Sequence, residues 1–538
     1  MTTRLLAVGF GALFFAACAR EAPPDDARDF PVAPAMTAEE LQTRLAGGEL
    51  TSEAAVRAYL ARIEKIDRSG PAIRSVISIN PNAIEDAKAR DAERGAGGAR
   101  GLLHGVPVLV KDNIETTELP TTAGSLALKD NRTGRDAPII SRLRAEGAII
   151  LGKTNLSEWA NFRSYDSISG WSGVNGQTRN PHHLAHDPCG SSSGSGAAVA
   201  AMLAPLAIGT ETNGSIACPA AMNGVVGFKP TVGLLSRTHI VPISASQDTA
   251  GPMARSVRDA AMLVSVLAGS DPADPATAEA DDRKTDYLAR IEDGVAGMRI
   301  GVFRWAEGDD PAISAVFNAA LNALEAEGAI LVEIDDFKPD PVFDGGPLKL
   351  LLAEFKDGLN GYLETAAPDV RTRSLADLIA FNDANADVEM PLFDQSIFLD
   401  AAKAPGLDDP DYLELKAALK RAAGPDGVDR LLTEHDVEAL VMPDRRPAPQ
   451  LPDPHAAKEA DMLQDPEEEK EDRARVGAGW LGAIAGYPLL SVPMGETDGL
   501  PLGLLIIGTA WEDERVLRIG RSYERASNAI VEPTFRND

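Results

Sequence analysis

The chain has 538 residues, of which 44% are hydrophobic and 25% are charged, the ordinary composition of a globular protein. Its formal net charge of −29 would repel the phosphate backbone of a nucleic acid, so DNA and RNA are disfavoured as partners. Only three cysteines are present, which excludes a disulfide-based scaffold at this length. For two of them, Cys189 and Cys218, we favour small buried thiols, although a bridge between them is also open.

Residues 1–18 are predicted to be an export signal of the lipoprotein type. Arg4 precedes an apolar run, residues 5–17, that is too short to span a bilayer comfortably. Small residues stand directly before Cys18, as in bacterial lipoprotein signals, in which this cysteine carries the lipid. Cleavage without a lipid is the alternative. We therefore expect export to the bacterial periplasm or outer membrane, with contact to a membrane only through Cys18 and with residues 19–36 as a flexible tether.

Periodic patterns begin at Thr37, where a capping box opens the first predicted helix, and a second, amphipathic helix is expected from Thr51 to about residue 66. Helices and short apolar strands then alternate. Predicted helices cover residues 81–93, 137–146, 197–204, 255–267 and 312–327. Predicted strands cover residues 106–110, 148–151, 206–208, 298–303, 329–334 and 502–507. The alternation predicts an α/β fold with a largely parallel sheet.

Two later segments differ in character from the alternating pattern. Residues 335–436 are predicted to be mainly helical and carry no motif of their own. Residues 446–475 are rich in proline and then strongly acidic, which favours a solvated excursion.

Two polar loops, joined by a short helix and a strand, stand at the centre of the sequence. The first, residues 190–196, reads GSSSGSG, and the second, residues 209–215, reads GTETNGS. A loop, a helix and a strand can fold back so that the two loops meet, with the hydroxyls of residues 191–193 beside Ser215. The glycines let backbone N–H groups turn toward a shared point. A nucleophile and an oxyanion hole can be assembled in this way.

Other interpretations of the first loop are weaker. A flexible linker is disfavoured because helix-forming alanines follow at once, and a phosphate-binding loop needs a lysine where Ala197 stands. The run GSSSG matches the G-x-S-x-G motif of α/β-hydrolases, with Ser192 as the nucleophile. That motif needs a downstream histidine, and those at positions 239, 435 and 455 lie in no recognisable context. The histidines at 182, 183 and 186 lack partners at ligand spacing, so we predict no metal site.

Three sequence motifs resemble those of the amidase signature family and follow one another in the same order as in that family. Residues 105–112 read GVPVLVKD, residues 189–195 read CGSSSGS, and GTETNGS follows. The resemblance runs from about residue 37 to residue 511 and is closest to bacterial peptide amidases, through stretches such as KTNLSEWANFR at 153–163. It implies an α/β/α sandwich around a large mixed, mostly parallel sheet. It also implies a single amidase domain over residues 37–538.

The resemblance implies a Ser–cis-Ser–Lys triad in which Ser215 is the nucleophile, Ser191 follows a cis peptide bond and Lys111 is the base. Lys111 must be neutral to act as a base, so burial must lower its pKa by several units from about 10.4. The implied oxyanion hole consists of the backbone N–H groups of Thr212, Asn213, Gly214 and Ser215. The candidate substrate-binding residues are Ser192, Asn161 and Asp248. No cofactor and no metal are implied.

Two residues depart from the common family pattern. Asn213 stands where many members have glycine, and asparagine tolerates left-handed backbone. Ala217 stands where many members carry an arginine that could pair with a substrate carboxylate, so a neutral or capped substrate is favoured.

We therefore expect an amidase for primary amides, with C-terminal amides of peptides first. Aryl, fatty or small aliphatic amides are the second interpretation, and a cell-envelope binding lipoprotein with a dead site is the third. Membership of a transamidation complex is disfavoured, because export would separate the chain from tRNA. The sequence leaves the oligomeric state open.

Overall fold

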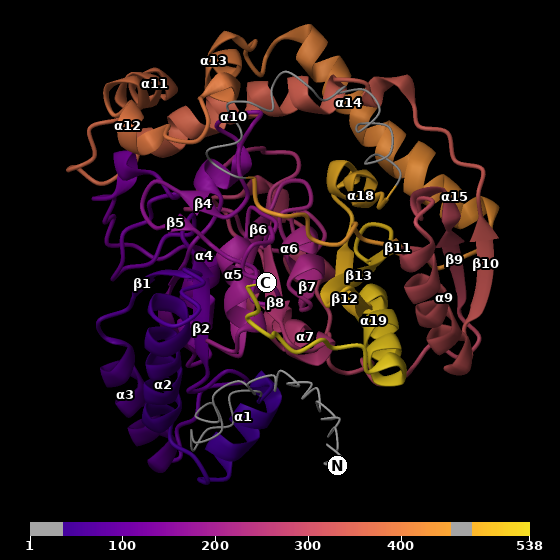
Figure 1. The fold of residues 1–538 in the computed structure, drawn as a ribbon, viewed down its shortest axis with the longest axis horizontal. Helices are drawn as coiled ribbons and strands as arrows, with labels where there is room; N and C mark the ends of the chain where they lie inside the picture. Colours follow the sequence, from indigo (N-terminus) through magenta and orange to yellow (C-terminus); the bar gives the residue numbers. More distant parts are fainter. Residues whose placement is uncertain (1–35, 453–475, 538) are drawn as a thin grey trace, which may run out of the picture.

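The computed structural model describes residues 36–452 and 476–537 (Figure 1). The predicted export signal with Cys18, almost all of the predicted tether and most of the acidic segment lie outside the described residues. One sheet of eleven strands runs through the molecule in the order β1-β3-β2-β6-β8-β7-β12-β13-β11-β9-β10. The strands are β1 (Val76–Ile79), β2 (Pro107–Lys111), β3 (Ile149–Thr154), β6 (Leu206–Glu211), β7 (Val226–Lys229), β8 (Thr249–Ala254), β9 (Arg299–Phe303), β10 (Ile330–Ile334), β11 (Ala439–Pro443), β12 (Leu489–Thr497) and β13 (Leu500–Ile507).

The sheet is mixed, and its parallel pairs lie toward its two ends. Strands β3, β2 and β6 are parallel neighbours, as are β11, β9 and β10. The other six neighbouring pairs of this sheet are antiparallel. The antiparallel share is therefore larger than the alternation of helices and strands predicts, because β12 and β13 form a hairpin that joins the two parallel groups through β7 and β8.

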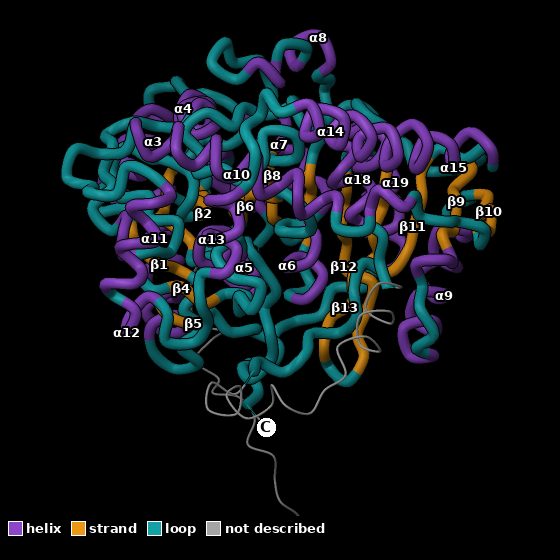
Figure 2. Tube along the Cα trace, turned by 90° about the horizontal axis from the view of Figure 1, so that it is seen from above, coloured by secondary structure: helices purple, strands orange, loops and turns teal. Residues whose placement is uncertain are grey.

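Helices cover both faces of the sheet, which confirms the predicted α/β architecture. Figure 2 shows α5 (Ser193–Ala200) and α6 (Ala217–Met222) on one side of the strands, and α4 (Pro138–Ala145) and α7 (Val257–Leu267) on the other. Helix α19 (Asp513–Ser527) packs against α7 and α9 (Pro311–Ala326). Most of the strands between the two layers are almost completely buried, as their continuous apolar sequences require, whereas the edge strands β1 and β10 are partly exposed.

The N-terminal helices begin where the capping residues place them. Thr37 and Glu40 form the predicted capping box of α1 (Ala38–Ala46), and the Thr51 side chain caps α2 (Ser52–Arg62). Helix α2 ends four residues earlier than predicted, and a π-helical turn (Ile63–Arg68) continues the chain. The third helix, α3 (Ala83–Gly95), starts and ends two residues later than predicted.

The segment after β10 is helical, as predicted, and forms an arch along one end of the strands (Figure 1). Its helices are α10 (Gly346–Glu364), α11 (Leu375–Ala384), α12 (Ala386–Glu389), α13 (Ser396–Lys403), α14 (Pro410–Ala423) and α15 (Asp429–Glu434). The arch packs on loops that follow β2, β3 and β7, through a cluster that includes Trp159, Phe355 and Phe398.

Helix α5 starts at Ser193, four residues before the predicted start at Ala197, so most of the first polar loop is helical. The difference has a packing cause. A Cβ atom at Gly194 would lie 2.4 Å from the backbone oxygens of both Ser75 and Asn155, so only glycine fits there. Close packing of small residues thus outweighs the low helix propensity of glycine and serine.

Candidate active site

Lys111 and the two polar loops meet at one end of the sheet. Lys111 is the last residue of β2, which pairs in parallel with β6, and β6 leads into the second loop. The first loop enters α5 through a cis peptide bond between Gly190 and Ser191, as the family resemblance implies. The Nζ of Lys111 lies 2.8 Å from the Oγ of Ser191 and 3.0 Å from the Oγ of Ser192. It also lies 2.8 Å from the Oγ1 of Thr210.

The environment of Lys111 favours its neutral form. Burial lowers the pKa of this completely buried amine to about 7, while the carboxylates of Asp248 and Glu211 act in the opposite direction. Its neighbours are hydroxyls and one backbone oxygen, and none of them is an ion-pair partner. Lys111 can therefore accept a proton near neutral pH, which an ordinary lysine does only in a small fraction of molecules.

The second loop is anchored on both sides of Ser215. The backbone oxygen of Ser215 accepts a hydrogen bond from the N–H of Ser192 (3.2 Å). The Glu211 carboxylate accepts from the N–H groups of Ile216 (2.7 Å) and Ala217 (3.0 Å), directly after Ser215. In the described parts of the chain, no group accepts a hydrogen bond from the N–H of residues 213–215. These N–H groups can therefore serve a developing oxyanion.

The left-handed residue of this loop is Gly214, with φ of +80°, and Asn213 keeps ordinary backbone. From the sequence we expected Asn213 to rely on the tolerance of asparagine for left-handed backbone. The structure does not use this tolerance, because Asn213 does not have a positive φ. Asn213 is instead exposed at the tip of the loop.

Of the candidate substrate-binding residues, Ser192 has its hydroxyl fully engaged by the protein. The Oγ of Ser192 donates to the backbone oxygen of Thr210 (3.0 Å) and accepts from its N–H (3.2 Å). Ser192 is completely buried, and its hydroxyl bonds to Lys111 and Thr210 rather than to a histidine, the base that the α/β-hydrolase interpretation requires. Ser192 thus supports the base instead of facing a substrate.

Asn161 and Asp248 lie close to the two loops. Asn161 ends three consecutive residues with positive φ, and a Cβ at Gly190 would lie 3.1 Å from its Nδ2, so it adjoins the cis peptide. Asp248 accepts from the Thr212 hydroxyl (2.6 Å) and from the N–H groups of Ile243 and Ser244 (2.8 Å each). Burial raises the pKa of Asp248.

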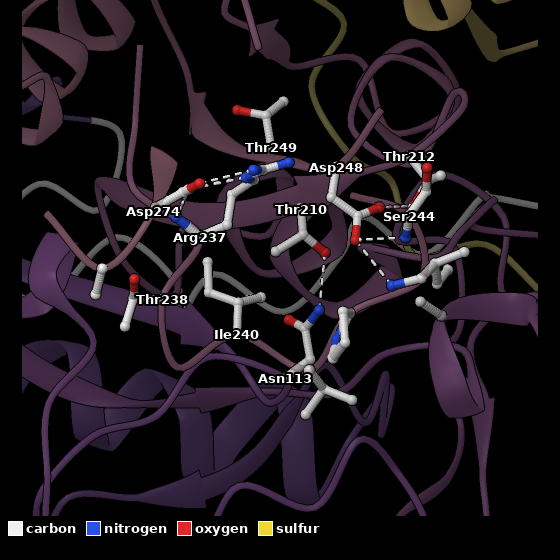
Figure 3. A pocket seen from close by; sticks show the side chains of 15 residues that line it. Asn113, Thr210, Thr212, Arg237, Thr238, Ile240, Ser244, Asp248, Thr249 and Asp274 are labelled. Atoms are coloured by element: carbon white, nitrogen blue, oxygen red, sulfur yellow. Dashed lines mark hydrogen bonds and ion pairs between the residues drawn. The ribbon is translucent and has the colours of Figure 1, made fainter. Parts of the chain in front are cut away.

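A cavity of about 210 Å³ adjoins this assembly (Figure 3). Thr210, Thr212 and Asp248 line it on the side of the loops, and its lining as a whole is mainly apolar. Its apolar lining residues are Ala160, Ile240, Val241, Pro242, Ile243 and Ala273. Arg237 also lines it, but its guanidinium is paired with Asp274 (2.7 and 2.9 Å) and donates to the backbone oxygen of Ala245. The cavity therefore suits an uncharged group.

Two features near the loops were missed or misjudged from the sequence. Cys189 and Cys218 form a disulfide, so the interpretation as free thiols is wrong. The loops bring their Cα atoms to 5.9 Å, within disulfide range, although 29 residues separate them. Ala217 carries no charge, but the Arg445 guanidinium approaches from the segment after β11 and would meet a Cβ on Gly214 at 2.3 Å. No local pattern could reveal either contact.

The clustered histidines are structural in the described residues. His182 is buried and hydrogen-bonded to the backbone oxygen of Asn223 (2.9 Å), and burial lowers its pKa to about 4. The rings of His183 and His186 lie 4.3 Å apart. Within residues 36–452 and 476–537, no group of three or more His, Cys, Asp or Glu side chains is placed to hold a metal ion.

Comparison with known proteins places this geometry in a family. The model of the amidase family matches residues 54–517. A protein of Arabidopsis thaliana named as a probable amidase is 36% identical, over 93% of this chain and 91% of that protein. A component of the glutamyl-tRNA(Gln) amidotransferase of Myxococcus xanthus is 35% identical, over 91% of this chain and 97% of that protein. The solved peptide amidase of Stenotrophomonas maltophilia has a TM-score of 0.87 and 47% identity, covering 94% of this chain and 99% of that chain.

The chain belongs to the amidase family, and the predicted amidase-signature fold is confirmed. It is accordingly an amidase, a hydrolase that acts on linear amide C–N bonds. No helix of the described residues is long and apolar enough to cross a membrane.

Proposed function

We propose that this amidase hydrolyses primary amides, with the C-terminal amides of peptides favoured, to the free acid and ammonia. The observation that carries the proposal is the completely buried Lys111, whose pKa is lowered to about 7 beside Ser191. The peptide amide preference is supported by the largely apolar cavity and by the 47% identity to the Stenotrophomonas maltophilia peptide amidase. An amidated peptide ends in an uncharged group, which suits a cavity whose one lining arginine is already paired.

The proposed reaction uses Lys111, Ser191 and Ser215. As the Oγ of Ser215 attacks the amide carbon, its proton passes to Ser191, and the proton of Ser191 passes to the neutral Nζ of Lys111. The carbonyl oxygen becomes an oxyanion that accepts from the N–H groups of the second loop, residues 212–215. The ammonium of Lys111 then returns a proton through Ser191 to the leaving nitrogen, and ammonia departs from an acyl-Ser215 ester. Water repeats the sequence and releases the acid.

Ammonia release from a panel of substrates tests the substrate class. The panel contains amidated peptides, the matching free-acid peptides, an aryl amide, a fatty amide and a small aliphatic amide. We expect the highest kcat/KM with the amidated peptides and no ammonia from the free acids. Faster hydrolysis of the aryl, fatty or aliphatic amide would show that amides of that class, and not peptide amides, are the preferred substrates. Ammonia from none of them would favour the binding lipoprotein.

Substitutions test the triad separately from the substrate. Ser215→Ala should leave only background activity, and Lys111→Ala should lower kcat by about 10²–10⁴-fold, the usual contribution of a general base. Ser191→Ala breaks the proton relay but leaves Ser215 and Lys111 in place, so it should retain slightly more activity than the other two variants. Because the three residues act as a unit, the triple variant should be little worse than Ser215→Ala alone. Near-normal kcat/KM in Lys111→Ala would reject the mechanism.

We also propose that the chain is exported and carries a lipid on Cys18. The apolar run of residues 5–17 before Cys18 supports this location, as does the Cys189–Cys218 disulfide, because disulfides persist mainly in oxidising compartments. Mass spectrometry of the mature N-terminus should find a lipidated Cys18. A mature chain that begins at another residue, or an unmodified Cys18, would reject the anchor.

A further inference from the structure

One wall of the cavity is supported from behind by the helical arch. This wall belongs to the segment of residues 241–246, of which residues 241–244 line the cavity, and Ser244 and Asp248 are both seen at the cavity in Figure 3. On the cavity side, Asp248 holds the wall by accepting from the N–H of Ser244. On the far side, the Ser244 hydroxyl donates to Glu354, a residue of α10. Ser244 is therefore held between two carboxylates, one inside the cavity region and one from the arch.

Glu354 makes more contacts with the wall and with the arch. It accepts from the hydroxyl of Ser246 and from its backbone N–H (3.0 Å), and from the hydroxyl of Tyr412 on α14 (2.8 Å). Lys416 lies 3.3 Å away from the same carboxylate. Burial acts to raise the pKa of Glu354, but the hydrogen bonds from Ser244, Ser246 and Tyr412 outweigh it and leave the pKa below its ordinary value. Glu354 therefore stays ionised, buried and fully occupied.

The same face of α10 touches the wall at two further points. Phe355 lines a small second cavity that shares Val241, Pro242 and Ile243 with the first. Gly358 follows Glu354 by four residues, which places it one turn along the same face. A Cβ at Gly358 would lie 3.2 Å from the Cγ of Pro242, closer than side chains usually approach. The position of α10 thus fixes how far Pro242 stands out into the cavity.

We propose that Glu354 is a positioning residue that holds the wall of residues 241–246 and thereby sets the size of the acyl group that the amidase accepts. Without its charge, the wall loses its outer support and shifts relative to Ser215. A large side chain next to the amide, which needs the wall in place, is then bound less well. A substrate without a side chain does not reach the wall and is unaffected. The inference rests on the proposed hydrolysis of amides at this cavity.

The test compares two uncharged peptide amides, N-acetylglycinamide and N-acetylphenylalaninamide. For Glu354→Gln we expect KM of the phenylalaninamide to rise about tenfold, as lost charge-assisted hydrogen bonds allow. KM of the glycinamide and both kcat values should stay within about twofold. Asp357→Asn is the matched control, because Asp357 is an exposed carboxylate on the same helix, and it should change neither substrate. An equal loss on both substrates, or a fall in kcat alone, would reduce Glu354 to a general structural role and overturn the proposal.

A second variant keeps the test decisive if Glu354→Gln does not fold. Gly358→Ala adds one methyl group against Pro242 within a helix that tolerates alanine, so the fold should survive. It should raise KM of the phenylalaninamide about threefold and leave the glycinamide unchanged; no difference between the substrates would contradict the proposal. If the wild type hydrolyses neither peptide amide, the proposed substrate class fails instead. In that case we expect both variants to raise KM for benzamide, which has the large acyl group, and to leave KM for acetamide unchanged.

Discussion

The pH dependence of catalysis follows from the state of Lys111. At pH 7 an ordinary lysine with a pKa of 10.5 is neutral in about one molecule in 3,000, whereas a pKa of about 7 makes about half of the molecules neutral. Because only neutral Lys111 can accept the proton from Ser191, kcat/KM should rise about tenfold per pH unit between pH 5 and 6 and level off above pH 8. An N-acetylated peptide amide serves as substrate, because it has no titrating group in this range. A midpoint near pH 10, or a flat profile, would refute the assignment of Lys111 as the base.

A substitution at Asp248 tests the direction in which a nearby carboxylate changes the pKa of Lys111. The Asp248 carboxylate favours the charged form of Lys111, so Asp248→Asn should move the midpoint to lower pH. The amide can keep the local hydrogen bonds if its oxygen accepts from Ile243 and Ser244 and its nitrogen donates to Thr212. The profile is measured with the same substrate. A midpoint that moves to higher pH would contradict the electrostatic description of the site.

Three further outcomes are expected. Replacing Cys189 and Cys218 together by serine should lower the free energy of unfolding by about 2–4 kcal/mol, as urea denaturation measures it, and an unchanged midpoint would argue against the bridge. Peptide amides should be hydrolysed faster than malonamate, because the Asp248 carboxylate lines the cavity and would repel a second carboxylate, and the reverse order would contradict this reasoning. Because the proposed steps use only side chains and backbone N–H groups, prolonged chelation should leave kcat unchanged, and a loss that zinc restores would contradict them.

The elements around the site were predictable because their signals are local. Thr37 and Thr51 cap their helices as expected, since a capping side chain bonds to a backbone group within three residues. Strand β2 was predictable from the five apolar residues 106–110, which directly precede Lys111, although the strand itself runs one residue later, from Pro107 to Lys111. The meeting of the two loops was predictable because a short helix and strand connect them, and the cis bond before Ser191 came from the family resemblance.

Contacts between distant segments were not predictable in this way. Glu354 reaches Ser244 across 110 residues. Arg445 follows β11 and Gly214 follows β6, and these two strands are not neighbours in the sheet, yet the two residues approach each other. The start of α5 at Ser193 depends on backbone oxygens from two other segments that leave no space beside Gly194. Each depends on tertiary packing, which periodicity and propensity do not encode. We retain one catalytic domain over residues 37–538 as a proposal, supported by a sheet that strands from both ends of the described chain share.

Trapping the acyl-enzyme tests the central claim most directly. A p-nitrophenyl ester of an N-acetylated amino acid acylates serine hydrolases faster than water removes the acyl group, so a rapid acid quench should capture the intermediate. Peptide mapping by mass spectrometry should then find the acyl group on Ser215, with none in the Ser215→Ala variant. An acyl group on Ser192 instead, or on neither serine while the ester is being consumed, would contradict Ser215 as the nucleophile and with it the proposed triad.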